Sequence, residues 1–312
     1  MDIQKKQMHE AAMLYYKKEY TQNEIANIMK LSRQTVSKLL RDALKEKIVD
    51  IKINNPEVSC KEFEEELCKR LKIKRVIVCG VSNDNEFLRL LITVRQAAEY
   101  IKFITQEGNQ KIGISWGRTV QMLISEFPVC NTMGNIVFPL FGATEQEQSY
   151  YMSNELARSF ADKICAKAKY AWFPYRPDST SDCELFRKTT YYKSLSELWK
   201  DIDIAIVGIG NQKIIQTFVN IFGYNEKCTY AIGDVSTHFF DEKGNILRLY
   251  ENTLCASKEN IISAKQTIAV ACGNDKAKAI VGAARTQMVD TLITDEYTAK
   301  NILYVLDRTT SK

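Results

Sequence analysis

Polar side chains with the chemistry of nucleic-acid contact recur along one short basic segment, Thr21–Lys47. Arg33 and Gln34 are of the types that form paired hydrogen bonds with base edges. Lys38 and Arg41 suit the phosphate oxygens of a backbone. The set therefore predicts contact with double-stranded DNA. The alternative is an ordinary helical hairpin whose basic face is only solvated, because amphipathic basic helices are common.

Two helices would have to position these side chains. Apolar residues recur at helical spacing on both sides of Ser32, which stands where an N-cap belongs. Small Thr35 and Ser37 keep the first turns of the second helix slim. The pattern predicts a helix-turn-helix with Ser32–Glu46 as the recognition helix. The candidate DNA-binding residues are Ser32, Arg33, Gln34, Thr35, Ser37, Lys38 and Arg41.

The flanks of this pair complete a small domain. Ile3–Lys18 predicts a first helix that packs on the other two. Ile48–Ile53 alternates apolar and charged residues, which predicts a half-exposed strand and hence a wing. Asn54-Asn55-Pro56 then breaks regular structure. We therefore expect an all-α, winged DNA-binding domain over residues 1–54 and a second domain over residues 55–312.

The second domain alternates strand and helix patterns. After a helix around Phe63–Leu71, the predicted strands are Val76–Cys79, Lys111–Ser115, Ile136–Leu140, Tyr170–Phe173, Ile204–Gly208, Thr267–Ala271 and Thr291–Thr294. The predicted helices between them are Phe87–Thr105, Thr119–Glu126, Ser149–Ala168, Ser194–Lys200, Asp275–Arg285 and Glu296–Leu306. Such alternation predicts an α/β fold with a mostly parallel sheet covered on both faces.

Small and polar residues follow five of these strands, where ligands of parallel sheets bind. The five segments are Trp116–Thr119, Gly142–Thr144, Gly208–Asn211, Gly273–Lys276 and Thr294–Glu296. The first can point backbone N–H groups and a helix N-terminus at an anion, and the fourth adds the Lys276 cation. One glycine after a strand is usually turn chemistry. Five such ends together predict a site for a small, phosphate-bearing molecule.

Composition excludes several other classes of protein. The 312 residues are 45% hydrophobic and 26% charged, as in a folded protein, and +4 of the net charge of +5 lies before residue 56. We call residues 1–54 the head and residues 55–312 the body. A basic head on a nearly neutral body is typical of a protein that binds nucleic acid through the head alone. Nine scattered cysteines without a C-x-x-C pair and only two histidines argue against a disulfide framework or a metal centre. We expect a cytoplasmic protein without a secretory signal, membrane helix, catalytic residues or cofactor.

The sequence resembles the SorC family of sugar-responsive bacterial transcriptional regulators over nearly its whole length. The motifs that carry the resemblance are the head LYYKKEYTQNEIANIMKLSRQTVSKLLRDALKEKIVDIKI and, in the body, GISWGRTV, VGIG, AIGDVSTHFFDEKGNI, ACGNDKAKAIVGAAR and LITDEYTA. The resemblance implies a body similar to sugar-phosphate isomerases that has lost catalysis. It also implies binding of a phosphorylated sugar or polyol as effector, and a homo-oligomer, a dimer or commonly a tetramer, that holds two operator half-sites.

The resemblance also assigns effector-binding positions. Residues matching the loop around the effector phosphate are Ser115, Gly117, Arg118 and Thr119. Those of the facing loop are Gly142, Ala143 and Thr144. Asp241 and Lys276 match positions that hold effector hydroxyls or phosphate.

Three departures from the family pattern bear on the chemistry. Phe141 stands where some members have a lysine that forms a Schiff base with a deoxysugar phosphate, and Ala143 replaces a glycine. Lys30 replaces a glycine in the turn of the helix-turn-helix, which costs on the order of 1 kcal/mol if that residue is left-handed.

The main alternative is a sugar-phosphate isomerase or deaminase-like enzyme. Such an enzyme needs a carboxylate base, for which Asp241 or Glu145 are candidates. The basic recognition helix favours a regulator, with repression as the default sign. His238, between apolar neighbours, is interpreted as a packed residue rather than a general base. Asp234 and Asp295 are candidates for helix caps or for ligands of hydroxyl groups.

Overall fold

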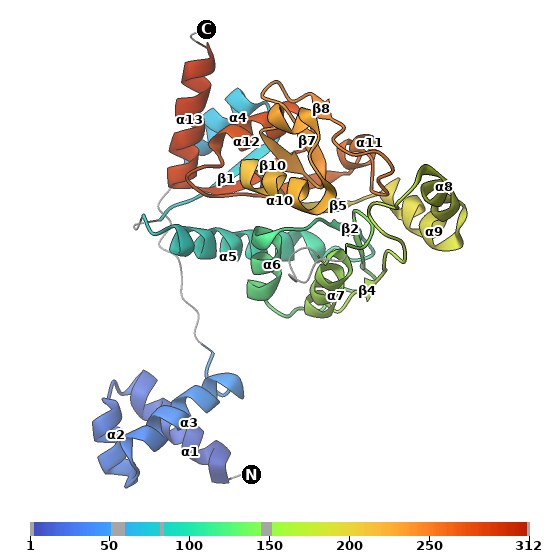
Figure 1. The fold of residues 1–312 in the computed structure, drawn as a ribbon. Coiled ribbons are helices and arrows are strands. Elements are labelled where there is room, and N and C mark those ends of the chain that lie inside the picture. The colour runs from blue at the N-terminus through green and yellow to red at the C-terminus, as the bar shows by residue number, and fades with distance from the viewer. Residues whose placement is uncertain (1–2, 51–59, 82–83, 145–151, 311–312) are drawn as a thin grey trace. The chain divides into compact units, whose positions relative to one another are not determined.

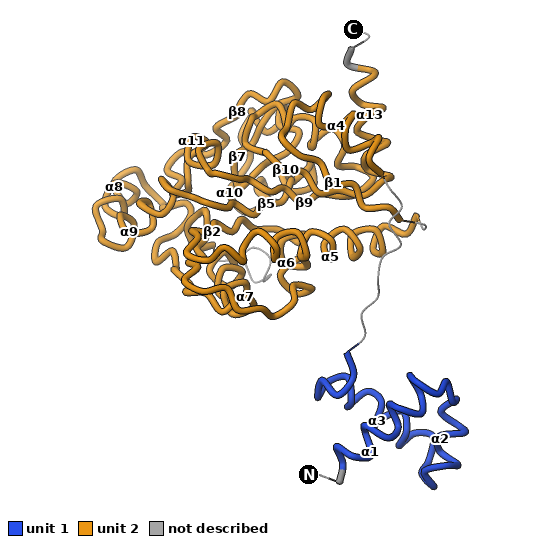
Figure 2. Tube along the Cα trace, turned by 180° about the vertical axis from the view of Figure 1, so that it is seen from behind, with its two compact units in different colours: residues 1–57 blue, residues 58–312 orange. Residues whose placement is uncertain are grey.

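The computed structural model describes residues 3–50, 60–81, 84–144 and 152–310. The chain divides into two compact units, Met1–Glu57 and Val58–Lys312 (Figure 2). Each unit has its own apolar core. Each is therefore described by itself.

The smaller unit is a three-helix core. It contains α1 (Ile3–Ala12), a π-helical turn η1 (Met13–Lys17), α2 (Gln22–Met29) and α3 (Arg33–Lys45). Thr21 and Glu24 form a capping box at the start of α2, which satisfies two of the amide groups that a helix start leaves open. The apolar face of α3 is buried against the other helices, as the sequence predicts.

The turn between α2 and α3 is left-handed at Lys30, with φ 54° and ψ 44°. Its backbone N–H donates to Ala26 and Asn27 carbonyls and so closes α2. The conformation anticipated at this departure from glycine is thus present. A lysine here carries a backbone penalty of about 1 kcal/mol that glycine would not.

The predicted wing strand over Ile48–Ile53 is wrong for its first three residues. Ile48 and Val49 form a bend, and Asp50 has no regular structure. The amides of Ile48 and Val49 both donate to the Ala43 carbonyl, so they close the end of α3 and are not available to a neighbouring strand. Ile51–Ile53 lie outside the described residues.

The larger unit is built on a mostly parallel sheet. In spatial order its main strands are β1 (Arg75–Cys79), β10 (Thr291–Asp295), β9 (Gln266–Val270), β5 (Ile204–Gly210), β2 (Lys111–Ile114), β3 (Ile136–Pro139) and β4 (Lys167–Ala168). All these neighbours pair in parallel. The expected α/β architecture is confirmed.

A short antiparallel extension, which the sequence did not predict, leaves the carboxyl end of β5. It consists of β6 (Gly233–Val235), β7 (His238–Phe240) and β8 (Ile246–Leu247). Residues Ile209 and Gly210 of β5 pair with β6. The extension therefore covers part of the sheet edge at which ligands of parallel sheets bind.

Helices cover both faces of the sheet (Figure 1). One face carries α5 (Glu86–Thr105), α6 (Arg118–Glu126) and α7 (Ser153–Ile164). The other carries α4 (Lys61–Leu71), α12 (Ala277–Arg285) and α13 (Glu296–Thr310). The remaining helices are α8 (Thr180–Lys188), α9 (Thr190–Trp199), α10 (Gln212–Phe222) and α11 (Lys258–Ile262). Of the described helices, none is both long and apolar enough to cross a bilayer.

Three predicted elements of the larger unit differ from the structure. The helix predicted over Ser194–Lys200 is α9 and starts four residues earlier, at Thr190. The strand predicted over Tyr170–Phe173 is a loop, and the strand is the preceding Lys167–Ala168. Burial alternates along this loop, but the Ala171 amide and carbonyl bond to the Asn154 side chain instead of a strand. The helix predicted to reach Ala168 ends at Ile164, because Cys165 is left-handed with φ 55°. Residues 149–151 of that prediction lie outside the described residues.

Candidate DNA-binding face and effector cavity

The exposed face of α3 carries the predicted DNA contacts. Val36, Leu39, Leu40 and Ala43 face the core. The side chains of Arg33, Gln34, Thr35, Lys38 and Arg41 are exposed. The helix therefore separates an apolar stripe from a basic and amide-bearing stripe that is free to enter a groove.

Two of the small predicted residues have local structural roles. The Ser32 side chain accepts a hydrogen bond from the Thr35 amide at 3.0 Å and so caps α3. The Ser32 and Thr35 hydroxyls also bond to each other at 2.8 Å. Ser37 is half-buried. Ser32 and Thr35 thus fix the start of α3, from which Arg33 and Gln34 project.

A cavity of about 320 Å³ opens at the carboxyl ends of β2, β5 and β9. We call it the strand-end cavity. Predicted residues Gly117, Arg118, Thr119 and Lys276 line it, together with Asp234. The structure therefore brings together residues of the first and the fourth predicted loops, Gly117–Thr119 and Lys276, which are far apart in the chain.

Residues at the starts of three helices line this cavity. Gly117 precedes α6 with φ 115° and, as a glycine, has no side chain to cap the helix. Asn211 precedes α10, and Lys276 precedes α12. Helix N-termini carry partial positive charge, so the arrangement favours an anion.

Lys276 and Asp234 have shifted ionisation in this cavity. The Lys276 ammonium donates to the Ile209 carbonyl at 2.8 Å, and burial lowers the pKa of this lysine. Burial raises the pKa of Asp234 to about 6, opposed by hydrogen bonds from the Thr237 amide and the Trp116 side chain. An anion entering the cavity would favour the charged form of Lys276.

An ion pair also lies on the cavity wall. The Lys213 ammonium stands 2.7 Å from the Asp275 carboxylate and joins the first turn of α10 to the Gly273–Lys276 loop. This hydrogen bond raises the pKa of Lys213 and lowers that of Asp275. The pair is largely exposed, so it adds little stability and can be replaced by contacts with a ligand.

Ser115 lies behind the strand-end cavity rather than in it. Its side chain is fully buried, and its hydroxyl has no hydrogen-bond partner within the described residues. Its amide donates to the Ile206 carbonyl at 2.9 Å and extends the pairing of β2 with β5. Ser115 thus attaches the start of the Trp116–Thr119 loop to β5.

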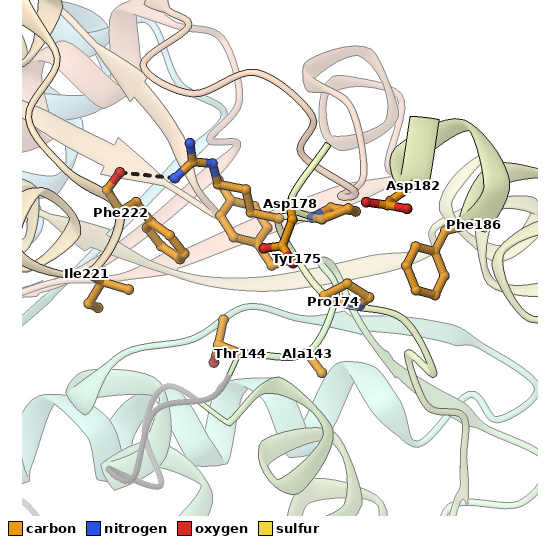
Figure 3. Close-up of a pocket in the computed structure, with 11 residues that line it drawn as sticks. Ala143, Thr144, Pro174, Tyr175, Asp178, Asp182, Phe186, Ile221 and Phe222 are labelled. Atoms are coloured by element: carbon orange, nitrogen blue, oxygen red, sulfur yellow. Dashed lines mark hydrogen bonds between the residues drawn. The ribbon is translucent and has the colours of Figure 1, made fainter. Parts of the chain in front are cut away.

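The Gly142–Thr144 loop faces a different cavity. Ala143 and Thr144 line a space of about 680 Å³ with Tyr175 and Phe222, shown in Figure 3. At Gly142 a Cβ atom would stand 2.5 Å from the Pro174 carbonyl carbon, which explains the glycine without a ligand. The structure thus does not bring these residues to the wall of the strand-end cavity.

Phe141 stands between the two cavities. Its ring is fully buried and makes edge contacts with Trp116 at 5.5 Å and with Tyr175 at 5.9 Å between centroids. Trp116 lines the strand-end cavity and Tyr175 lines the other. An aromatic wall therefore occupies the position where some family members were expected to have a reactive lysine.

Asp241 is held within its own turn. Its carboxylate accepts hydrogen bonds from the Lys243 and Asn245 amides, both at 2.9 Å. The neighbouring Glu242 carbonyl accepts from Arg285, the last residue of α12. Lys276 precedes the opposite end of that helix, so Asp241 lies away from the strand-end cavity that it was predicted to serve.

Two residues with open roles have structural partners. His238 bonds to the Ala256 carbonyl at 2.9 Å, and burial lowers its pKa, as expected for a packed histidine. Asp295 accepts the amides of Tyr297 and Thr298 and caps α13. Sequence reasoning missed two residues that line the strand-end cavity. Glu86 lies one residue before the predicted helix start at Phe87, and Lys213 belongs to α10, a helix that was not predicted.

Comparison with known proteins covers both units. The family model described as "Putative sugar-binding domain" matches residues 55–304, and that of sigma-70 region 4 matches residues 9–46. The chain is 26% identical to the sorbitol operon regulator of Klebsiella pneumoniae, over 94% of this chain and 96% of that protein. It is also 26% identical to the deoxyribonucleoside regulator of Bacillus subtilis, over 97% and 99%.

Solved structures agree with this match. The crystal structure of the full-length sorbitol operon regulator from Klebsiella pneumoniae superimposes with a TM-score of 0.71 at 26% identity, over 96% of this chain and 99% of that one. A transcriptional regulator from Streptococcus pneumoniae has a TM-score of 0.73 at 24% identity over 82% and 100%, which shows the shared fold.

Proposed function

The chain belongs to the SorC family of transcriptional regulators, which join a helix-turn-helix to a sugar-binding domain. We propose that it represses a carbohydrate-utilisation operon and responds to a phosphorylated sugar or polyol. We assign DNA binding to residues 1–54 and effector binding and oligomerisation to residues 55–312. The protein acts where its operator lies, in the cytoplasm.

The head reads DNA through α3. Arg33 and Gln34 contact base edges in the major groove, while Lys38 and Arg41 hold phosphates. The exposure of all four side chains on one helix supports this assignment. Ser32, Thr35 and Ser37 keep the start of the helix capped and narrow enough to approach the groove.

The body binds the effector in the strand-end cavity. The observation that carries this proposal is the convergence of three helix N-termini with Arg118 and Lys276 on about 320 Å³. The Gly117–Thr119 loop holds the phosphate, and Lys276 holds phosphate or hydroxyl oxygens. Asp234 accepts a hydrogen bond from a sugar hydroxyl. Effector roles for Ser115, Gly142, Ala143, Thr144 and Asp241 have no support from this geometry.

Regulation couples the two sites through assembly. Dimers or tetramers of the body fix the spacing of paired heads on a roughly palindromic operator. The effector stabilises one packing of the bodies, so the heads match their half-sites less well. The shift can be no larger than the effector's difference in affinity for the two states.

Fluorescence anisotropy with DNA from upstream of the protein's own operon tests this function. We would add a panel of phosphorylated sugars and polyols, with the unphosphorylated compounds as controls. One phosphorylated compound should release the DNA while its unphosphorylated counterpart does not. Tight DNA binding that no compound alters would contradict the effector assignment, and absence of specific binding would contradict the whole proposal.

A further inference from the structure

A buried arginine lies directly behind the strand-end cavity. Arg89, in the first turns of α5, is 1% exposed and does not line the cavity itself. Glu86 and Leu90 of the same helix do. An arginine is rarely buried to this extent unless its charge and donors are matched by specific partners, so its contacts indicate what it holds in place.

The shortest polar contact of Arg89 is with the Gly273–Lys276 loop. Its Nη2 donates to the Asn274 side-chain oxygen at 2.5 Å. The nearest carboxylate, that of fully buried Asp295, is 3.6 Å from Nη1, beyond hydrogen-bond length. Asp295 takes its hydrogen bonds from the start of α13 instead. The Asp295 carboxylate therefore offsets the positive charge of the guanidinium, whereas the hydrogen bond of the guanidinium goes to Asn274.

The same loop is anchored at two further points. The Gly273 amide donates to the Thr298 hydroxyl at 3.0 Å, and this hydroxyl donates to Asp295. At the other end of the loop, the Lys276 ammonium donates to the Ile209 carbonyl inside the cavity. The position of Lys276 thus depends on a short segment whose rear side is attached to α5 and α13.

We infer that Arg89, acting through Asn274, is a positioning residue that holds the Gly273–Lys276 loop so that the Lys276 ammonium stays aimed into the strand-end cavity. The inference rests on the proposed function for its ligand class, a phosphate-bearing molecule. Because Glu86 and Leu90 share a helix with Arg89, the contact also joins two walls of the cavity, α5 and the loop, into one rigid part.

Asn274 offers the cleaner test because its side chain is exposed, whereas removing Arg89 would leave Asp295 buried without its cation. Asn274→Ala removes the acceptor. Asn274→Asp keeps an acceptor oxygen for the guanidinium and is the conservative variant that should rescue. Asn131→Ala, at an exposed asparagine in another loop, is the matched control.

The first readout needs no effector. The full chain is treated with an amine-acylating reagent, and labelling of Lys276 is followed by peptide mass spectrometry. We expect labelling of Lys276 to rise several-fold in Asn274→Ala and to match the unchanged protein in Asn274→Asp and Asn131→Ala. Unchanged labelling in Asn274→Ala would overturn the inference.

The second readout is calorimetric titration with inorganic phosphate. Asn274→Ala should bind phosphate about three- to tenfold more weakly, the effect of one lost hydrogen bond, and Asn131→Ala should keep the affinity. Equal affinity in Asn274→Ala would also overturn the inference. Changed labelling of Lys276 in a protein that binds no phosphate would leave the positioning role intact and contradict the phosphate site of the proposed function.

Discussion

Substitutions of different polar side chains on α3 should change DNA binding in different ways. Arg33→Ala should reduce discrimination between cognate and random DNA by about 1–3 kcal/mol, because a base contact is lost. Lys38→Ala should weaken binding to both DNAs together and lower the salt slope by about 1, because a phosphate contact is lost. Anisotropy titrations at several salt concentrations measure both effects. An equal loss on both DNAs from Arg33→Ala would refute base reading by that residue.

Lys276 separates effector binding from DNA binding. Lys276→Ala removes the ammonium from the strand-end cavity, so the response of the protein to effector should disappear. Because Lys276 is far in sequence from α3, the affinity for operator DNA without effector should stay unchanged. Lys278→Ala, at an exposed lysine of α12, is the control and should keep the response. The anisotropy assay with the active compound decides, and a normal response in Lys276→Ala would exclude this role.

Asp234 should make stability depend on pH. With a folded-state pKa of about 6 against an ordinary value near 4, the unfolded chain ionises first as pH rises. Stability contributed by this residue is therefore lost between about pH 4 and pH 6 and stays lost above. Asp234→Asn should be more stable than the unchanged protein at pH 7, by up to about 3 kcal/mol, and nearly equal near pH 4.

Urea unfolding at the two pH values measures this difference. The asparagine keeps an oxygen that can accept from the Thr237 amide, so the hydrogen bond in that direction is retained. The same stability difference at both pH values would show that the titration of Asp234 is not its source.

At the scale of elements, the turn of the helix-turn-helix contains a removable strain. Lys30→Gly relieves the left-handed penalty at φ 54° and should stabilise the smaller unit by about 0.5–1 kcal/mol. Lys45→Gly, in the last turn of α3, is the opposite control and should destabilise it by up to about 1 kcal/mol. Thermal unfolding followed by circular dichroism compares the two. Destabilisation by Lys30→Gly would contradict this account of the turn.

Several long periodic elements could be predicted from the sequence, although α10 and α8 were missed, and the shortest strands could not. Apolar spacing gave α3 and α5 to within two residues at each end. Strands β6, β7 and β8 contain two or three residues each, too few for a period to repeat. The Tyr170–Phe173 loop alternates in burial like a strand, and only the Asn154 side chain, which takes its hydrogen bonds, distinguishes it.

At the scale of the whole molecule, the candidate site was predictable only in part. The parallel sheet implies that loops after β2 and β9 meet, which is why Arg118 and Lys276 could be placed together. Nothing local marks Arg89 or Glu86, because their position depends on how α5 lies across the sheet. The separation of the Gly142–Thr144 loop from the strand-end cavity could not be predicted, since the wall formed by Phe141 arises from ring packing between distant segments.

The two units should respond separately to a ligand. Their cores share no residue, so a phosphorylated compound that binds the body should raise the unfolding temperature of the larger unit and leave that of the smaller unit unchanged. At a hundred times the dissociation constant the stabilisation amounts to about 2.7 kcal/mol. Differential scanning calorimetry with and without the compound measures it, and a shift of both transitions would contradict independent units.

The α3 face and the strand-end cavity are supported by separate apolar cores. Mutations can therefore change the residues of one site without destabilising the other. A few substitutions among Arg33, Gln34 and Lys38 would redirect the regulator to a new promoter while its chemical signal stays the same. Substitutions around Asp234 would retune the signal while the promoter stays the same. In an engineered gene circuit, the promoter specificity and the effector specificity of one chain could therefore be exchanged independently.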